Sequence, residues 1–264
     1  MPSILAGTGV MFPLTFAYVV RDIFTSVSSS YDLMNDAMSL GVHRLWKDDF
    51  ISLLDPGSGG PIEVLDMAGG TGDISLRILD HARTKYYDRE THVNICDINP
   101  DMLEQGRRRF KQTMYHNTPQ VSFQVANAQA LPKDHFPNNS VDLYTIAFGI
   151  RNCTSIRDVL SEAHRVLKPG GVFACLEFGK VENPLLASAY EQYSFSIIPL
   201  LGSILASDRD SYQYLVESIR RFPPQDEFAR MIRDAGFHIG PEREGGAWRD
   251  LWMGIASIHT GVKL

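Results

Sequence analysis

Short apolar runs alternate with amphipathic stretches through the middle of the chain. The apolar runs have the length of buried strands, whereas the stretches between them repeat their apolar positions at helical spacing. The expected strands cover residues 62–67, 93–97, 121–126, 141–148 and 172–178. The expected helices are one ending near Thr84, one beginning at Pro100 and one over residues 156–167. This alternation predicts an α/β fold with a doubly wound, mostly parallel sheet.

The region after the fifth strand departs from this pattern. Residues 179–224 carry apolar and aromatic side chains at helical spacing, most densely over residues 185–205. They predict a helical insertion, and two interpretations stay open: an apolar lid or tunnel, or ordinary core helices. Beyond the insertion we expect a helix over residues 226–235 and two closing strands, the second around residues 252–259. The closing strands bring the expected sheet to seven.

The N-terminal residues fit this organisation least. The stretch from Ile4 to Val20 is uncharged, is short for a membrane-spanning helix and lacks the basic start of a secretory signal. A packing segment and a contact with a membrane surface both remain open. We therefore expect an atypical segment over residues 1–23, one domain over residues 24–264, and a helix over residues 26–46.

Composition narrows the class of protein. The formal net charge of −6 argues against a nucleic-acid partner, which would require a clustered basic face. The one basic cluster, residues 107–109, lies on an expected helix and is interpreted as a solvated face. The three cysteines (Cys96, Cys153 and Cys175) have no CxxC spacing, so we expect reduced thiols and no metal site.

The first strand leads into a glycine turn with the sequence Gly69-Gly70-Thr71-Gly72. Glycine suits such a turn because it accepts positive φ and lets the main chain approach a ligand closely. Asp97 closes the second strand, where a carboxylate can accept both hydrogens of a ribose diol. Asn127 and Ala128 follow the third strand and reach the same edge of the sheet. Together these residues predict a nucleoside site.

Two nucleosides fit this geometry, a dinucleotide and S-adenosylmethionine. A dinucleotide site has a third small residue that lets helix and strand pack, and its diphosphate lies at the helix N-terminus. Here Ser75 occupies the third glycine position, and Asp73 places a negative charge where the diphosphate would lie. A sulfonium with a free amino group tolerates Asp66 and Asp73 better than a diphosphate does. S-adenosylmethionine is therefore the favoured cofactor, with a nicotinamide-dependent oxidoreductase as the competing class.

Several segments carry a resemblance to known enzymes. Residues 64–73 and 167–171 resemble the class I methyltransferases in general. The ubiquinone/menaquinone biosynthesis C-methyltransferase family is resembled in more detail by residues 31–36, 41–47, 148–152, 210–220 and 258–261. The resemblance implies S-adenosylmethionine-dependent methylation of a ring carbon of a polyprenyl benzoquinol in ubiquinone biosynthesis. Demethylmenaquinol methylation and a non-catalytic scaffold role remain as alternatives.

The resemblance also implies roles for individual residues. Thr71, Asp97, Asn127 and Ala128 match the cofactor motif, and Arg151 falls at the site. A ring carbon becomes nucleophilic when its neighbouring hydroxyl ionises, and a cation beside that oxygen favours ionisation. We assign to Arg151 either this task or the positioning of a water that takes the proton, since arginine stays protonated and cannot itself be the base. Candidate proton acceptors are His43, Asp36, Asp208 and Asp210, with Tyr31 as a relay.

Location and partners follow from the resemblance alone. It implies a mitochondrial protein on the matrix face of the inner membrane. It also implies a membrane-associated complex with other quinone-biosynthesis enzymes, and a homodimer as one expected oligomeric state.

Overall fold

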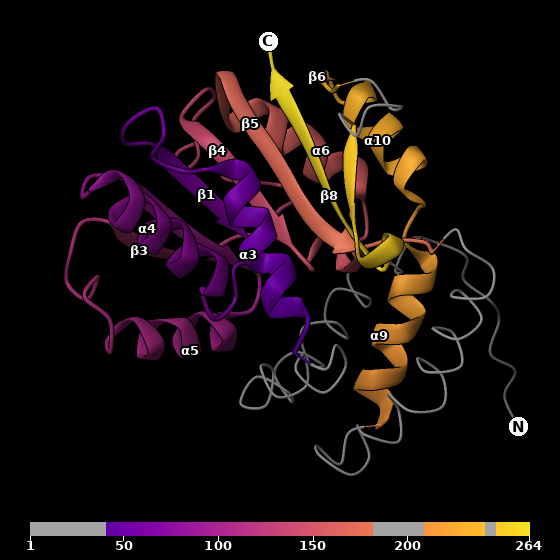
Figure 1. The fold of residues 1–264 in the computed structure, drawn as a ribbon, viewed down its shortest axis with the longest axis horizontal. Helices are drawn as coiled ribbons and strands as arrows, with labels where there is room; N and C mark the ends of the chain where they lie inside the picture. The colour runs from indigo at the N-terminus through magenta and orange to yellow at the C-terminus, as the bar shows by residue number, and fades with distance from the viewer. Residues whose placement is uncertain (1–40, 182–208, 241–246) are drawn as a thin grey trace, which may run out of the picture.

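The computed structural model of the chain describes residues 41–181, 209–240 and 247–264. Their central sheet has eight strands, in the order β3-β2-β1-β4-β5-β8-β6, with β7 paired to β8 (Figure 1). Strands β1 to β5 are parallel, and β8 runs antiparallel to β5. The strands are β1 (Glu63–Met67), β2 (His92–Asp97), β3 (Val121–Val125), β4 (Val141–Ala147), β5 (Leu167–Phe178), β6 (Phe237–His238), β7 (Trp248–Leu251) and β8 (Ala256–Lys263).

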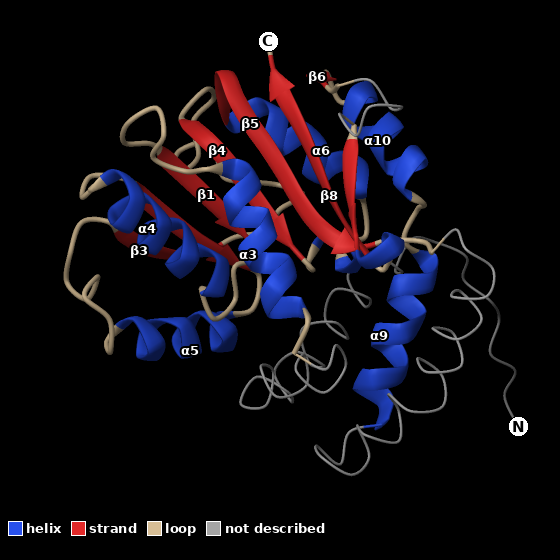
Figure 2. Cartoon of the chain, viewed as in Figure 1, coloured by secondary structure: helices blue, strands red, loops and turns tan. Residues whose placement is uncertain are grey.

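Helices cover both faces of this sheet (Figure 2). They are α3 (His43–Leu54), α4 (Asp73–Tyr86), α5 (Pro100–Phe110), α6 (Ile156–Val166), α9 (Arg209–Arg221) and α10 (Gln225–Asp234). Helices α3, α4 and α5 share one buried cluster with the sheet, whereas α6 and α10 share the other. Helix α9 lies beyond the edge at which β5 ends. The α/β, doubly wound class expected from the sequence is confirmed.

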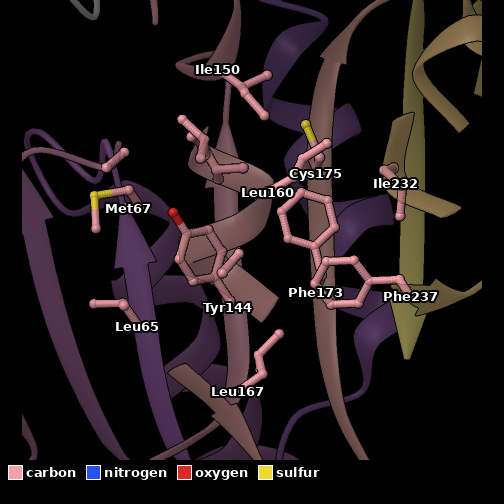
Figure 3. Packing of buried hydrophobic residues seen from close by; sticks show 14 of the residues in the cluster. Leu65, Met67, Tyr144, Ile150, Leu160, Leu167, Phe173, Cys175, Ile232 and Phe237 are labelled. Carbon is pink, nitrogen blue, oxygen red and sulfur yellow. The ribbon is translucent and has the colours of Figure 1, made fainter. Parts of the chain in front are cut away.

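The buried cores follow from the strand periodicity. Because successive side chains of a strand point to opposite faces, Leu65 packs in the α6 cluster while Val64 packs in the α3 cluster. Figure 3 shows the cluster that contains Leu65, where aromatic rings from β4, β5 and β6 meet. The ring centroids of Tyr144 and Phe173 lie 5.8 Å apart, and those of Phe173 and Phe237 lie 5.4 Å apart. This packing fixes the strands whose ends carry the site.

Three details of the expected fold were wrong. The closing strand begins at Ala256, because Trp252, Met253 and Gly254 all have positive φ and interrupt extended backbone. The extra strand β7 pairs alongside β8, so the sheet has eight strands instead of seven. Strand β5 begins at Leu167, because this residue already pairs with Val141 ahead of a shift in register.

The helix expected over residues 26–46 also differs in its described part. Residues 26–40 lie outside the described residues, but α3 begins at His43 and continues to Leu54. Trp46, Phe50 and Ile51 are buried on one side of this helix, which explains its continuation. Asp55 then ends the helix in the left-handed conformation, with φ of 45°.

Part of the expected insertion cannot be compared with the structure. The apolar stretch over residues 185–205 lies outside the described residues, and α9 is the described remainder of the insertion. Among the helices that the structure does describe, none has the length and apolar character required to cross a membrane.

Candidate nucleoside and methyl-transfer site

A cavity opens at the carboxyl ends of β1, β2, β3 and β4, where a doubly wound sheet binds its ligands. The residues after β1 line it, followed by the ends of the other three strands. Of the predicted cofactor residues, the structure brings six to this cavity: Gly69, Gly70, Thr71, Asp97, Asn127 and Ala128. The prediction that residues following the strands gather at one edge of the sheet is therefore confirmed for these six residues.

At two positions of the glycine turn, any larger residue would collide with neighbouring side chains. A Cβ on Gly69 would lie 2.8 Å from the side chain of Ile95, and one on Gly72 would lie 2.6 Å from the ring of Phe110. Gly72 also has φ of 76° and directly precedes α4. It does not line the cavity, so its contribution is to let the turn pack against β2 and α5.

Asp97 is oriented toward this turn. One carboxylate oxygen accepts a hydrogen bond from the Gly70 N–H at 3.1 Å, and the other accepts one from the Asn99 N–H at 2.9 Å. Desolvation by the surrounding protein raises the pKa of Asp97 to about 6. At neutral pH the group is ionised and retains lone pairs that a diol can use.

The part of the cavity that follows β2 and β3 holds residues of two kinds. Asn127 is exposed, and its side-chain oxygen accepts a hydrogen bond from the Gln129 N–H at 3.0 Å. Ile98 and Met102 supply apolar surface opposite Ala128, and Ile98 remains 42% exposed. The sequence analysis missed Ile98, although an apolar residue directly after the terminal acid of β2 was a usable signal.

Both carboxylates that the sequence placed near the turn line the cavity, but each already has partners within the protein. Asp66 is buried and accepts hydrogen bonds from Ser75 Oγ at 2.5 Å and Thr145 Oγ1 at 2.8 Å. Burial raises the pKa of Asp66 to about 6. It therefore ties β1 to α4 and β4 as well as lining the cavity.

Asp73 already has cationic partners. It accepts contacts from Lys47 Nζ at 2.8 Å, from Arg109 at 3.0 Å and from Arg77 at 3.4 Å. Burial would raise the pKa of Asp73, but these three cations outweigh it and hold the pKa well below its usual range. The negative charge that the sequence placed at this position is therefore present, but three cations of the protein offset it. Lys47, which the sequence analysis did not select, lines the cavity through this pair.

Arg151 lies in the short η1 helix (Ile150–Asn152) directly after β4, beside the cavity residues Gly149 and Asn152. Its guanidinium is not part of the cavity wall. It donates to Glu177 Oε1 at 2.7 Å, to the Phe148 carbonyl at 2.5 Å and to Ser218 Oγ at 3.3 Å. The Arg151 side chain is 3% exposed and that of Glu177 is 0% exposed.

The remaining predicted catalytic residues are not gathered at the cavity. His43 begins α3 and is buried, one helical turn before Lys47, and does not line the cavity. Tyr31, Asp36 and Asp208 lie outside the described residues, and the side chain of Asp210 is likewise not described. Their roles stay predictions.

Helix α9 contacts the same short segment from the other side. The Tyr214 hydroxyl donates to the Asn152 side-chain oxygen at 3.3 Å, next to the contact between Arg151 and Ser218. The cavity wall at Asn152 and helix α9 of the insertion are therefore directly connected.

This sheet order, with a glycine turn after β1 and an acid at the end of β2, defines a class I methyltransferase fold. A Burkholderia thailandensis 1,6-didemethyltoxoflavin-N1-methyltransferase, solved with S-adenosylhomocysteine, matches with a TM-score of 0.59 at 16% identity, covering 98% of this chain and 93% of that one. A SAM-dependent methyltransferase from Aquifex aeolicus matches with a TM-score of 0.53 at 15% identity, covering 83% and 89%. Identities this low establish the fold alone.

The family is established by sequence. The chain belongs to the ubiE/COQ5 methyltransferase family, whose model matches residues 14–263. The mitochondrial 2-methoxy-6-polyprenyl-1,4-benzoquinol methylase of Schizosaccharomyces pombe is 57% identical, over 94% of this chain and 80% of that protein. The ubiquinone/menaquinone biosynthesis C-methyltransferase UbiE of Cereibacter sphaeroides is 48% identical, over 94% and 92%. The resemblance noted in the sequence is confirmed.

Proposed function

We propose that this protein transfers the methyl group of S-adenosylmethionine to a ring carbon of 2-methoxy-6-polyprenyl-1,4-benzoquinol in ubiquinone biosynthesis. The observation that carries this proposal is the Asp97 carboxylate held against the glycine turn at the cavity wall. The relative from Schizosaccharomyces pombe, which is named for methylation of this quinol, is 57% identical over nearly the whole chain.

The described residues divide the cofactor between them. Asp97 would accept the ribose hydroxyls, and Asn127, Ala128 and Ile98 would hold the adenine. Gly69, Gly70 and Thr71, which line the cavity, would admit the methionine portion, because glycine lets the main chain approach a ligand closely. When bound, the cofactor supplies an electrophilic methyl group.

The protein must then make a ring carbon nucleophilic. A phenol has a pKa of about 10, so ionising it near pH 7 requires a shift of roughly 3 units, or about 4 kcal/mol. A guanidinium in a site with little water can supply a good part of this. We assign that task to Arg151, which follows β4 and is flanked in sequence by the cavity residues Gly149 and Asn152.

Two competing functions remain to be separated from this one. Methylation of demethylmenaquinol uses the same chemistry, and the Cereibacter sphaeroides relative is named for both quinones. A non-catalytic scaffold would bind cofactor without turnover, and the preserved glycine turn and Asp97 contact argue against it. The nicotinamide-dependent alternative gains no support from the family, which is one of methyltransferases.

Location and partners form the finer part of the proposal. Several eukaryotic relatives are named as mitochondrial, which supports a mitochondrial location. We extend this to the matrix face of the inner membrane and to a complex with other quinone-biosynthesis enzymes, since a polyprenyl tail partitions into lipid. A homodimer, and an apolar lid formed by residues 179–224, belong to the same proposal.

Mass spectrometry of products tests the substrate choice. The protein is incubated with S-adenosylmethionine and short-chain quinols that carry or lack the ring methoxy group, together with a demethylnaphthoquinol. We expect methylation of the methoxybenzoquinol at the highest kcat/KM. Preference for the naphthoquinol would favour the menaquinone reading, and cofactor binding without any product would favour the scaffold.

A further inference from the structure

A buried ion pair between Arg151 and Glu177 lies behind the cavity residues Phe148, Gly149 and Asn152, since Arg151 belongs to the same short segment after β4. Glu177, near the end of β5, accepts hydrogen bonds at Oε1 from Arg151 Nη1 at 2.7 Å and from the Phe178 N–H at 2.9 Å. Its other oxygen, Oε2, is buried and has no hydrogen-bond partner among the described residues. The carboxylate is therefore satisfied on one side only.

Among the described residues, Arg151 is the cation that bonds to Glu177. The strand register places Glu177 opposite Ser257, whose buried hydroxyl also lacks a described partner. Two thiols lie near Glu177, namely Cys175 on the same strand and Cys153 directly after η1. The carboxylate of Asp250, on β7 opposite Ser257, accepts a hydrogen bond from Gln225. From α9, Ser218 contacts Arg151. Burial raises the pKa of Tyr214, also on α9, and the nearby positive charge of Arg151 opposes that rise. Burial raises the pKa of Glu177, and Arg151 opposes that rise only in part.

Charge balance then limits what Arg151 can do alone. A guanidinium that is fully paired with a buried carboxylate presents almost no net positive charge to a third group. Adding a phenolate would leave two anions sharing one cation in a site of low polarity. Arg151 can stabilise the phenolate only if the Glu177 carboxylate is neutralised at the same time.

We infer that Glu177 is a catalytic residue that works together with Arg151: it stores the proton of the substrate hydroxyl while the guanidinium exchanges its carboxylate partner for the phenolate oxygen. This inference rests on the proposed function. The O–H bond of the quinol breaks and its proton is taken up at Glu177 Oε2, directly or through a bridging water. The ring carbon then forms its bond to the methyl group as the sulfur–methyl bond breaks. When the ring carbon loses its hydrogen as a proton to solvent, the stored proton returns to the oxygen.

The charge of the buried group stays constant through this cycle. Before the proton moves to Glu177, Arg151 pairs with the Glu177 carboxylate. After the proton has moved, and before the methyl group is transferred, Arg151 pairs with the phenolate, so one anion replaces another. The unpartnered lone pairs of Oε2 are the ones available to receive the proton. The reaction therefore avoids placing an uncompensated charge in the core.

The substitution Glu177→Gln tests this inference, because it keeps the shape and the acceptor oxygen but removes the basic site. Storage of a proton is general-base chemistry, so we expect kcat/KM at pH 7 to fall by about 10²–10³-fold with an ordinary quinol. A quinol made more acidic by ring halogenation needs less help, so the variant should recover at least tenfold relative to wild type with that substrate. A purely structural role would lower both rates equally, and that result would overturn the inference.

Glu162→Gln provides the matched control. Glu162 forms a half-buried pair with Arg165 at 2.8 Å on α6, away from the cavity. This variant should keep the wild-type ratio of rates for the two quinols. Affinity for S-adenosylhomocysteine, measured by calorimetry, should be unchanged in both variants, because neither residue lines the cofactor cavity.

A measurement on the wild-type protein covers the case in which Glu177→Gln does not fold. The acidic limb of kcat/KM against pH should lie at the same pH for both quinols, because it reports the enzyme carboxylate. A limb that moves with the acidity of the quinol would contradict the inference. Absence of methyl transfer by the wild-type protein to any quinol would instead refute the proposed function, so the two failures are distinguishable.

Discussion

The two halves of the site are built in different ways. The cofactor half comes from short segments at the ends of adjacent parallel strands, where the glycine turn and Asp97 already meet through strand order. The half around Arg151 joins η1, the end of β5 and α9, so that Arg151 contacts Glu177 and Ser218 from distant parts of the sequence. A local motif thus suffices to bind a nucleoside, whereas the electrostatics of the reaction depend on tertiary contacts.

This difference explains what the sequence could and could not predict. Strand ends follow from apolar runs, so the positions of Gly70, Asp97 and Asn127 at one cavity were predictable. The pairing of Arg151 with Glu177 was not, because nothing in the spacing of those residues indicates that their side chains meet. The three cations around Asp73 were missed for the same reason.

Errors in the fold arose from the same cause. The start of the last strand was misplaced because the positive φ values at Trp252 and Met253 depend on tertiary context, since neither residue type favours that conformation. The predicted end of helix α3 was too early. Its continuation depends on the burial of Phe50 and Ile51 against the sheet, and helix propensity does not include such tertiary contacts.

The largest effect should come from removing the cation. Arg151→Gln is expected to lower kcat by about 10²–10³-fold while leaving the affinity for S-adenosylhomocysteine within about twofold. Because Glu177 would lose its buried partner, the free energy of unfolding should also fall by about 3–5 kcal/mol. Steady-state kinetics below the unfolding temperature, with calorimetry, separate the two readouts. The control Arg165→Gln should leave kcat unchanged. Loss of cofactor affinity in Arg151→Gln would contradict the separation of the site into a cofactor-binding half and a reaction half.

A second substitution should act on the other half. Asp97→Asn is expected to weaken binding of S-adenosylmethionine by about 10–100-fold, because hydrogen bonds to a charged group contribute about 1.5–3 kcal/mol. Since Asp97 lies far from the reacting methyl group in the proposed arrangement, kcat at saturating cofactor should change little. Calorimetry and saturation kinetics give the two numbers. A fall in kcat with unchanged cofactor affinity would contradict the assignment.

The glycine turn should show a smaller effect on stability. Gly72→Ala places a Cβ at a residue with φ of 76° and 2.6 Å from Phe110, so we expect a loss of about 1–3 kcal/mol and a Tm lower by several degrees. Gly170→Ala is the matched control, because its φ is 83° but no atom lies within 4 Å of the added Cβ. Equal losses in the two variants would show that packing against α5 contributes nothing.

The smallest effect should be a pH dependence of cofactor binding. The pKa of Asp97 is raised from 3.8 to about 6, so the carboxylate is ionised above that pH and protonated below it. Affinity for S-adenosylhomocysteine should be constant between about pH 7 and 8 and should weaken by up to about tenfold as pH falls toward 5. Asp66 titrates over the same range, so Asp97→Asn is needed as the comparison. If that variant keeps the full pH dependence, Asp97 is not its origin.

The position of the transferred methyl group tests the central claim most directly, namely that the cavity presents a methyl donor to a ring made nucleophilic at carbon. The protein is supplied with S-adenosylmethionine labelled with ¹³C in its methyl group and a short-chain methoxybenzoquinol, and the product is examined by carbon NMR. The account predicts the label on a ring carbon only. A label on a quinol oxygen, or cofactor turnover with no labelled quinol, would contradict it.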